Sequence, residues 1–582
     1  MRESAIPGPG PFVRKRDGRL VPFDPDKIAQ ALFAATEAIG RPDAFLGREL
    51  TDGVLYFLAQ ENEVHPLTTQ SIAEVVVKVV RELGQPTLAE AFAAFGRQKA
   101  VGPQLLSQTD RDLSSRTYDR PDIVLRFGAT TPLNEYVPAC TRHFSLNAVY
   151  HRDVAAAHRD GLLTLTGLEA PNQLASLTLS PAHAATDRAA GALGELEVVR
   201  RSAGQSIAID GAEYRYAQLT EAPTSFVRDL TVGLRLTNLQ AAINLNSASA
   251  PPWVGDVGDS PLFVGQGSDI QAVQTAELAD SLLTELGEIK PALQHVRIHW
   301  HLAEADFGPE RSGRLHRILR FALEGSPVTF VFNRPRMAQS LAEGMDRQHP
   351  TVLGVVGLGL PHLARHPRVA GEQGMFLDKL GSLARLAVSA GVQKREYLRR
   401  LERSWGSGAA ALGSGFLLDR ARLVVVPVGL ECVVRMLTGH GLGEEPAALK
   451  VGCEIIRRLA ESLGHAGRQV YLDACLDGTF DFTIADTPGR QLFPAADNAA
   501  GVTGWDPALA VADQLRVAGA LHEAAGAGTM ALFAPAHAPT VEQASDWLAR
   551  AWKTPAVRRL QLLMRHPAEH QLTFGGDRPD GL

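Results

Sequence analysis

Residues 13–28 constrain the fold of this chain more than any other stretch. Three consecutive cations at positions 14–16 are followed by Asp17-Gly18, a dipeptide typical of a tight β-hairpin turn. A second short apolar strand follows at residues 20–23. The pattern predicts a hairpin that carries a cluster of positive charge close to its turn.

A helix is predicted to follow this hairpin, over residues 25–39. Asp24 is a favourable N-cap, and Pro25 occupies the first helical position, where proline is favoured. Lys27 falls in the first turn, where the helix dipole disfavours a cation. A lysine there, facing the hairpin cations, indicates a bound anion, because fixed cations and helix-end N–H groups both favour closely spaced phosphates. Charge alone leaves a second interpretation open, a solvated basic hairpin without a ligand.

The order of these elements resembles the ATP-cone, the regulatory nucleotide-binding module of ribonucleotide reductases and of their repressors. The Val-x-Lys-Arg-Asp-Gly hairpin, the Asp-Lys-Ile helix start and later helices that end in Arg-Gln-Lys carry the resemblance, over about residues 12–100. It implies ATP or dATP as effector, with Mg²⁺ between the phosphates and the protein. Many cones carry Glu where this chain has Val21. The nucleotide contacts that the resemblance implies are Val13, Lys15, Arg16, Lys27, Thr69 and Lys99.

Length and composition set the domain organisation. A chain of 582 residues with 45% hydrophobic residues predicts a small domain plus one or two large ones. We expect residues 1–11 to be disordered, 12–101 to form the cone, 102–135 to be a linker, and 136–582 to form the large domain. Within the cone, apolar residues at helical spacing predict a helix over 68–83.

Charge and cysteine usage exclude several classes of protein. A net charge of −6 argues against general nucleic-acid binding. We find no run of about 18 apolar residues and no apolar signal-peptide core at the N-terminus, so we expect a soluble, cytoplasmic protein without a membrane partner. The four cysteines form no C-x-x-C pair, which argues against a thiolate zinc site.

The large domain alternates strands with helices. Continuous apolar runs at 353–360 and 423–430 predict buried strands, and the glycines at 354–359 are interpreted as part of a strand, not as a dinucleotide-binding loop. Strands of this kind favour an α/β sheet or barrel that is buried on both faces. Helices are predicted at 373–389, 431–438, 446–463 and 506–524.

Five segments of this domain resemble, in the same order, the anaerobic glycyl-radical ribonucleotide reductases. The resemblance implies a glycyl-radical-enzyme-like α/β barrel of as many as ten strands behind the cone. The segments are 157–166, 355–364, 386–398, 426–439 and 484–491.

The residues that carry out the radical chemistry of that family are missing at the matching positions. The family presents a radical glycine in Arg-Val-x-Gly-Tyr after a four-cysteine zinc site, whereas a C-terminal turn explains Gly575 and Gly576 better here. The cysteine that forms the thiyl radical is expected shortly before the 355–364 segment, yet residues 332–351 contain none. We therefore assign no catalytic residue.

Two further motifs of the family pattern have changed. Gly359 and His362 replace the Asn and Arg of Asn-Leu-Pro-Arg, and the early His-x-His-Asp has become Thr-Leu-Thr-Gly at 164–167. Four losses that serve one reaction indicate that the reaction itself is gone.

One histidine-rich patch is a candidate metal site. His299 and His301 share a face if this segment is a strand, and Glu304 would be an acidic ligand for a transition metal. A role in the core or on the sheet surface is the favoured interpretation, and no metal ligand is assigned.

These observations predict an ATP- or dATP-binding regulatory protein with a catalytically inactive reductase-like body, a pseudoenzyme. Its expected readout is effector-dependent homo-oligomerisation, with a separate reductase or activase as a further partner. The main alternative is a divergent anaerobic ribonucleoside-triphosphate reductase. A nucleotide-sensing repressor is the third, although the acidic net charge weighs against DNA binding.

Overall fold

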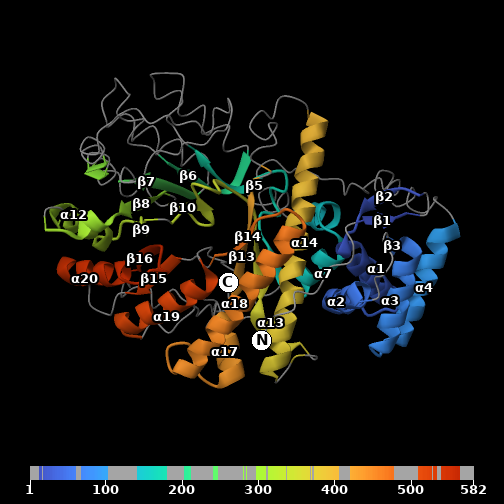
Figure 1. The fold of residues 1–582 in the computed structure, drawn as a ribbon. Coiled ribbons are helices and arrows are strands. Elements are labelled where there is room, and N and C mark those ends of the chain that lie inside the picture. The colour runs from blue at the N-terminus through green and yellow to red at the C-terminus, as the bar shows by residue number, and fades with distance from the viewer. Residues whose placement is uncertain are drawn as a thin grey trace, which may run out of the picture. The chain divides into compact units, whose positions relative to one another are not determined.

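The computed structural model divides the chain into two compact units, residues 1–160 and 161–582. Each is described by itself below, and Figure 1 gives the element labels. The structure describes residues 12–15, 18–60, 67–101, 141–179, 202–210, 240–246, 279–280, 283–284, 296–309, 312–335, 337–366, 369, 372–405, 418, 420–477, 509–526, 529–533 and 539–563.

The first unit combines a small sheet with helices. Strand β1 (Phe12–Arg14) lies between β2 (Leu20–Pro22), which is antiparallel to it, and β3 (Leu67–Thr68), which is parallel. The expected hairpin is present, and four helices follow it, two of them close to the predicted ranges 25–39 and 68–83. The helices are α1 (Pro25–Ala38), α2 (Ala44–Gln60), α3 (Thr69–Glu82) and α4 (Pro86–Val101).

Local capping explains where two of these helices begin. The Asp24 side chain accepts a hydrogen bond of 3.1 Å from the Asp26 N–H, as expected for the N-cap of α1. Thr68 and Ser71 form a reciprocal capping box at the start of α3.

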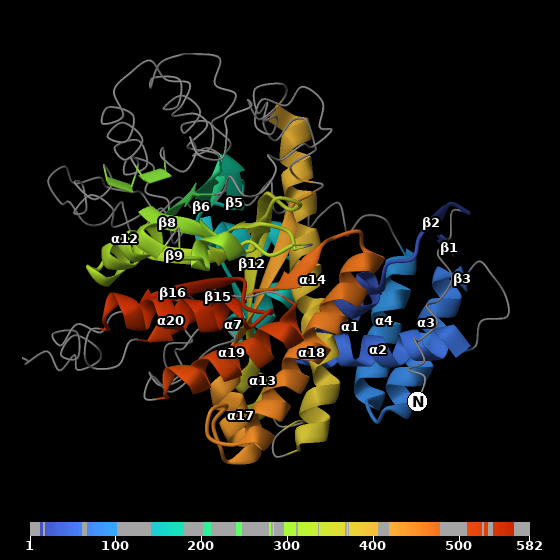
Figure 2. The ribbon, with the colours of Figure 1, turned by 60° about the vertical axis from the view of Figure 1, so that its left-hand side comes forward.

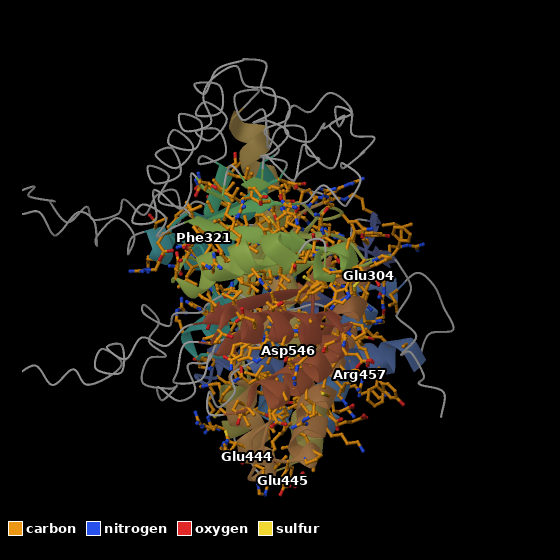
Figure 3. All side chains as sticks on the ribbon, turned by 90° about the vertical axis from the view of Figure 1, so that its left-hand side faces the viewer. Glu304, Phe321, Glu444, Glu445, Arg457 and Asp546 are labelled. Atoms are coloured by element: carbon orange, nitrogen blue, oxygen red, sulfur yellow. The ribbon has the colours of Figure 1, made fainter. Side chains whose placement is uncertain are left out.

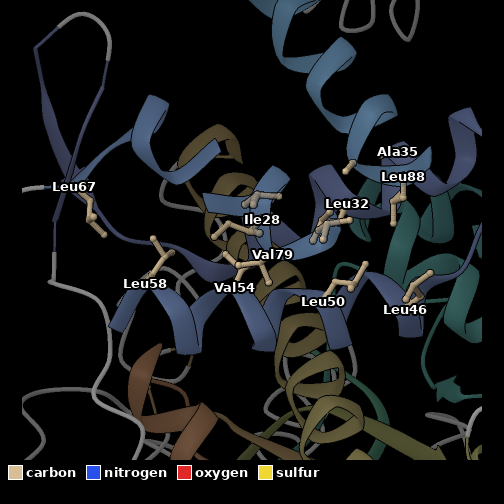
Figure 4. Packing of buried hydrophobic residues seen from close by; sticks show 13 residues of the cluster. Ile28, Leu32, Ala35, Leu46, Leu50, Val54, Leu58, Leu67, Val79 and Leu88 are labelled. Atoms are coloured by element: carbon tan, nitrogen blue, oxygen red, sulfur yellow. The ribbon is translucent and has the colours of Figure 1, made fainter. Parts of the chain in front are cut away.

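The apolar faces of the four helices share one core, shown in Figure 4. Helix α2 contributes Leu46, Leu50, Val54 and Leu58, spaced four residues apart, which places them on one face of the helix.

Two further elements complete the first unit. They are the π-helical turn η1 (Ser145–Val149) and α7 (Arg152–Arg159), and α7 packs on α1 and α2. For this reason the first unit extends to Asp160.

The second unit is built on ten strands arranged as two sets of five. The first set is all parallel and consists of β5 (Leu174–Leu179), β6 (Ala203–Ile209), β7 (Gln240–Leu245), β8 (Val296–Leu302) and β9 (Val328–Phe332).

The second set runs in the opposite direction. It consists of β12 (Thr351–Gly359), β13 (Arg422–Val428), β14 (Ala474–Leu476), β15 (Thr529–Phe533) and β16 (Arg559–Leu563).

Two antiparallel pairs, β5–β12 and β9–β16, join the sets, and β4 (Leu163–Leu165) adds an eleventh strand beside β12. Among the described strands the sheet runs as one path from β14 to β15, and no described pairing joins these two ends. The expected α/β body is thus confirmed with ten strands.

Helices cover this sheet. Helix α14 (Gln373–Trp405) packs on α18 (Pro446–Gln469), which in turn packs on α19 (Val511–Ala525), as both Figure 1 and Figure 2 show. The remaining helices are α12 (Ser312–Leu323), α13 (Leu360–Arg365), α17 (Leu430–Thr438) and α20 (Val541–Trp552), with a short 3₁₀ turn, η5 (Glu304–Phe307). Among the described residues, no helix is both long and apolar enough to cross a membrane.

Helix α14 is much longer than the predicted 373–389. The prediction ends close to Gly391, which breaks the helical pattern in the sequence. In the structure the helix continues, and a Cβ at this position would lie 2.8 Å from Leu472 and 2.9 Å from Leu423. Gly391 therefore permits close packing of the helix and does not end it.

We predict that Gly391→Ala destabilises the protein by about 1–3 kcal/mol, because the added methyl overpacks the contact with two leucines. Gly374→Ala in the same helix is the matched control. No atom lies within 4 Å of its Cβ position, so we expect it to be neutral or to stabilise by up to about 1 kcal/mol. Denaturant unfolding of both variants checks this, and equal free energies of unfolding would contradict the packing role.

Candidate functional site

The sheet of the first unit brings two implied nucleotide contacts together. Arg14 pairs with Thr68 across parallel strands, so Lys15 and Thr69, the residues that directly follow these strands, lie at the same end of the strand pair. Both are exposed, while Val13 is buried and pairs with Leu67. Lys15 thus sits at an open edge where a charged ligand can reach it.

Backbone hydrogen bonds hold Lys15 at the start of the hairpin turn. Its N–H donates to the Arg19 carbonyl at 2.8 Å, and its carbonyl accepts from the Gly18 N–H at 2.9 Å. Gly18 has a φ of +84°, the left-handed conformation that such turns require. The turn residue Arg16 lies outside the described residues.

Lys27 lies in the first turn of α1, as predicted, and 68% of its side chain is exposed. Its ammonium group is 3.6 Å from Asp24 Oδ2. An exposed pair of this kind contributes little stability, so a phosphate can replace the carboxylate as the partner of Lys27. Lys99 lies within α4, but its side chain is outside the described residues.

One residue of this unit was missed by the sequence analysis. Arg48 of α2 is buried, and its guanidinium donates to Asp26 of α1 and to Asp153 of α7. Its partners lie 22 and 105 positions away, so no local motif reveals them.

In the second unit, the segment expected to hold the radical cysteine forms a buried hairpin. Its strands are β10 (Ser340–Ala342) and β11 (Met345–Asp346), joined at Glu343-Gly344. Leu341, Ala342 and Met345 share an apolar cluster with residues of β5, β6, β7, β12 and β13. The hairpin therefore packs against strands from both sets.

Charged groups hold the tip of this hairpin. The Gly344 N–H donates to Asp477 Oδ2 at 2.8 Å, and Arg559 donates to the same oxygen at 3.2 Å. The Glu343 carboxylate lies 3.4 Å from Arg297 and 4.0 Å from Arg559. A network of two acids and two arginines thus holds the tip of a hairpin that lies within residues 332–351, the segment in which the resemblance places a thiol.

The base of the hairpin is fixed in a similar way. Asp346 accepts from Arg422 at 3.2 Å and from the His349 N–H at 2.8 Å. Although burial disfavours the charged carboxylate, these contacts lower the pKa of Asp346 to about 2. Upstream, Arg334 donates to carbonyls at and beyond the C-terminus of α20, including those of Ala551 and Trp552.

The two histidines of β8 are part of this polar interior. His299 Nδ1–H donates to the Leu341 carbonyl at 2.9 Å, and His301 Nε2–H donates to Asn244 Oδ1 at 2.8 Å. Burial lowers the pKa of His301 to about 4 and that of His299 well below its ordinary value, so both rings are neutral near pH 7.

The metal hypothesis for these histidines gains no support. Both rings are fully buried, whereas Glu304 is exposed at the surface (Figure 3). In the part of the chain that the structure describes, no three His, Cys, Asp or Glu side chains are arranged to hold a metal ion.

One cysteine thiol does lie near the interior, on β14 and not on the hairpin. Cys475 of β14 packs against the apolar cluster of the hairpin, and burial raises the pKa of its thiol to about 12. It is therefore a thiol, not a thiolate, at neutral pH. Cys432 and Cys453 lie on the helices α17 and α18, and Cys140 is outside the described residues.

The strand that carries Gly359 approaches β4 closely. The Gly359 N–H donates to the Leu162 carbonyl at 3.0 Å. A Cβ at Gly359 would lie only 2.1 Å from the carbonyl oxygen of Gly161, so only glycine fits here. The segment 484–491 and the tail with Gly575 and Gly576 lie outside the described residues.

Comparisons with known proteins agree with this geometry. Residues 11–100 match the model of the ATP cone domain. No curated protein matches the chain.

Solved structures match much more of the chain. The anaerobic ribonucleotide reductase from Thermotoga maritima in complex with dATP and CTP has a TM-score of 0.59 and 12% identity, covering 78% of this chain and 85% of that chain. The same enzyme with dATP in its specificity site has a TM-score of 0.60 and 12% identity, covering 74% and 85%. At this identity the likeness concerns the fold. Residues 11–100 are therefore an ATP-cone domain, and the chain has the fold of the anaerobic ribonucleotide reductases.

Proposed function

We propose that this protein is an ATP- or dATP-responsive regulatory protein whose reductase-like body does not reduce ribonucleotides. The observation that carries the proposal is the hairpin of residues 340–346, whose tip, Glu343-Gly344, lies in an ionic network. The segment 332–351, where the resemblance places the radical-forming thiol, contains no cysteine. A carboxylate held by arginines cannot pass a hydrogen atom as a thiol does.

The cone supplies the nucleotide-binding part of this proposal. Lys15 and Thr69 lie at one open end of β1 and β3, and Lys27 lies in the first turn of α1, where it pairs with the exposed carboxylate of Asp24. Arg16 and Lys99 complete the proposed set, with Mg²⁺ between the phosphates and the protein. Fixed cations beside a helix N-terminus are a suitable environment for a triphosphate.

The proposed output is a change in association. If ATP and dATP bind two assemblies with different affinities, each nucleotide shifts the equilibrium between them by that difference. The proposed partners are further copies of this chain, which form a homo-oligomer, and a separate reductase or activase. The proposed location is the cytoplasm.

One observation favours the alternative of an active, divergent reductase. Cys475 places a protonated thiol against the apolar cluster of the hairpin, two residues before Asp477, which holds the hairpin tip. A hydrogen atom could be abstracted from that thiol only if a radical were delivered to it.

We predict that Lys15→Ala weakens binding of ATP and of dATP by more than tenfold, because it removes a charge-assisted contact worth roughly 1.5–3 kcal/mol. Arg81→Ala is the matched control: Arg81 is an exposed cation at the other end of α3 from Thr69, about 18 Å along the helix. Titration calorimetry measures both variants. Unchanged affinity in Lys15→Ala would remove the nucleotide site from this edge.

We also predict that the full chain makes no deoxyribonucleotide from any of the four ribonucleoside triphosphates. The measurement is an anaerobic assay with a radical-generating activase and formate or a dithiol as reductant. Turnover in the wild type that disappears in Cys475→Ser would establish the reductase alternative and refute the inactive body.

A further inference from the structure

A buried arginine ties the cone to a helix that lies outside the ATP-cone match. Arg48 of α2 is 3% exposed. Its Nη2 donates to Asp153 Oδ2 of α7 at 2.7 Å, and its Nη1 donates to Asp26 Oδ1 of α1. Asp153 is also buried, and it follows the 102–135 segment in the sequence.

This contact is too costly to be incidental packing. Each buried charge loses its hydration and is tolerated only with a well-placed partner. Burial by itself lowers the pKa of the Arg48 guanidinium, but the carboxylates of Asp26 and Asp153 outweigh burial and hold that pKa above its ordinary value. We call Arg48, Asp26 and Asp153 the Arg48 cluster. Removing either carboxylate would leave part of the buried Arg48 charge without a partner.

One end of the cluster reaches the proposed phosphate site. Asp26 directly precedes Lys27, and its N–H donates to the Asp24 side chain. The Lys27 ammonium in turn lies 3.6 Å from that side chain. A phosphate that replaces Asp24 as the partner of Lys27 brings negative charge into the same helical turn as Asp26. This added charge changes the strength of the interaction between Asp26 and Arg48.

The other end reaches the start of the body along the chain. Helix α7 ends at Arg159, and β4 begins four residues later at Leu163. β4 pairs with β12, the strand that follows the buried hairpin. Helix α7 is therefore connected through only three residues of chain to a strand that pairs with the central sheet.

We propose that Arg48 couples nucleotide occupancy at the N-terminus of α1 to the docking of α7 on the cone. This inference rests on the proposed nucleotide-binding function. Coupling of this kind is reciprocal, because a ligand that changes the docking of α7 must bind with an affinity that depends on that docking.

An exposed ion pair between the same two helices offers a matched control. Arg152 of α7 lies 3.4 Å from Glu37 of α1, and 77% of its side chain is exposed. A pair so exposed is screened by solvent and contributes little. Arg152→Ala therefore removes an α7–α1 contact without touching the Arg48 cluster.

The experiment is hydrogen exchange with mass spectrometry on the full chain, with and without ATP and dATP, combined with calorimetry. In the wild type and in Arg152→Ala, we expect nucleotide to change exchange in residues 152–159 by at least threefold. In Asp153→Asn we expect this response to disappear, and the nucleotide affinity to shift by about fivefold or more.

The outcomes separate the two proposals. If the wild type binds nucleotide but exchange in 152–159 does not respond, or if Asp153→Asn responds like the wild type, the coupling is wrong and the binding function stands. If the wild type binds neither nucleotide, both are wrong. Should Asp153→Asn fail to fold, Arg48→Lys replaces it, because a single ammonium cannot reproduce the two-sided guanidinium contact and must weaken the response.

Discussion

The architecture of the body depends on one requirement: the polar side chains of the central strands must find partners inside the protein. Asn244, His299 and His301 are fully buried, and each is hydrogen-bonded to backbone or side-chain groups. The β10–β11 hairpin contributes the Leu341 carbonyl to this network and its apolar residues to the neighbouring cluster. The hairpin is therefore part of the core, and an ionic network holds its tip.

The cone also contains a buried ionic network, a smaller one than that of the body. Arg48 is as buried as the arginine at the hairpin tip, and in both places a guanidinium joins two carboxylates from elements far apart in the sequence. Such networks do not add much net stability compared with apolar packing, but they are costly to break. They are suited to fixing one arrangement, or to switching between two when one carboxylate gains another partner.

Local chemistry made much of the fold predictable. The Asp24 cap and Pro25 located the start of α1, and the apolar run at 353–360 located β12, which spans Thr351–Gly359. The extension of α14 was not predictable, because the reason for Gly391 lies in leucines more than thirty positions away. The hydrogen bond between Gly344 and Asp477 joins residues 133 positions apart, and that between Arg48 and Asp153 joins residues 105 positions apart. Neither contact therefore produces a local sequence pattern. The sequence showed that residues 332–351 contain no cysteine, but it could not show the ionic contacts that hold this segment.

The close approach at Gly359 restricts which residues this position can accept. The carbonyl of Gly161 occupies the space that the first side-chain carbon of an asparagine would need, 2.1 Å away. Backbone cannot move aside as a flexible side chain can, so any residue larger than glycine would force the chain at Gly161 to shift. Residue 359 can therefore change only together with the backbone around Gly161, so these two positions are expected to co-vary among related sequences.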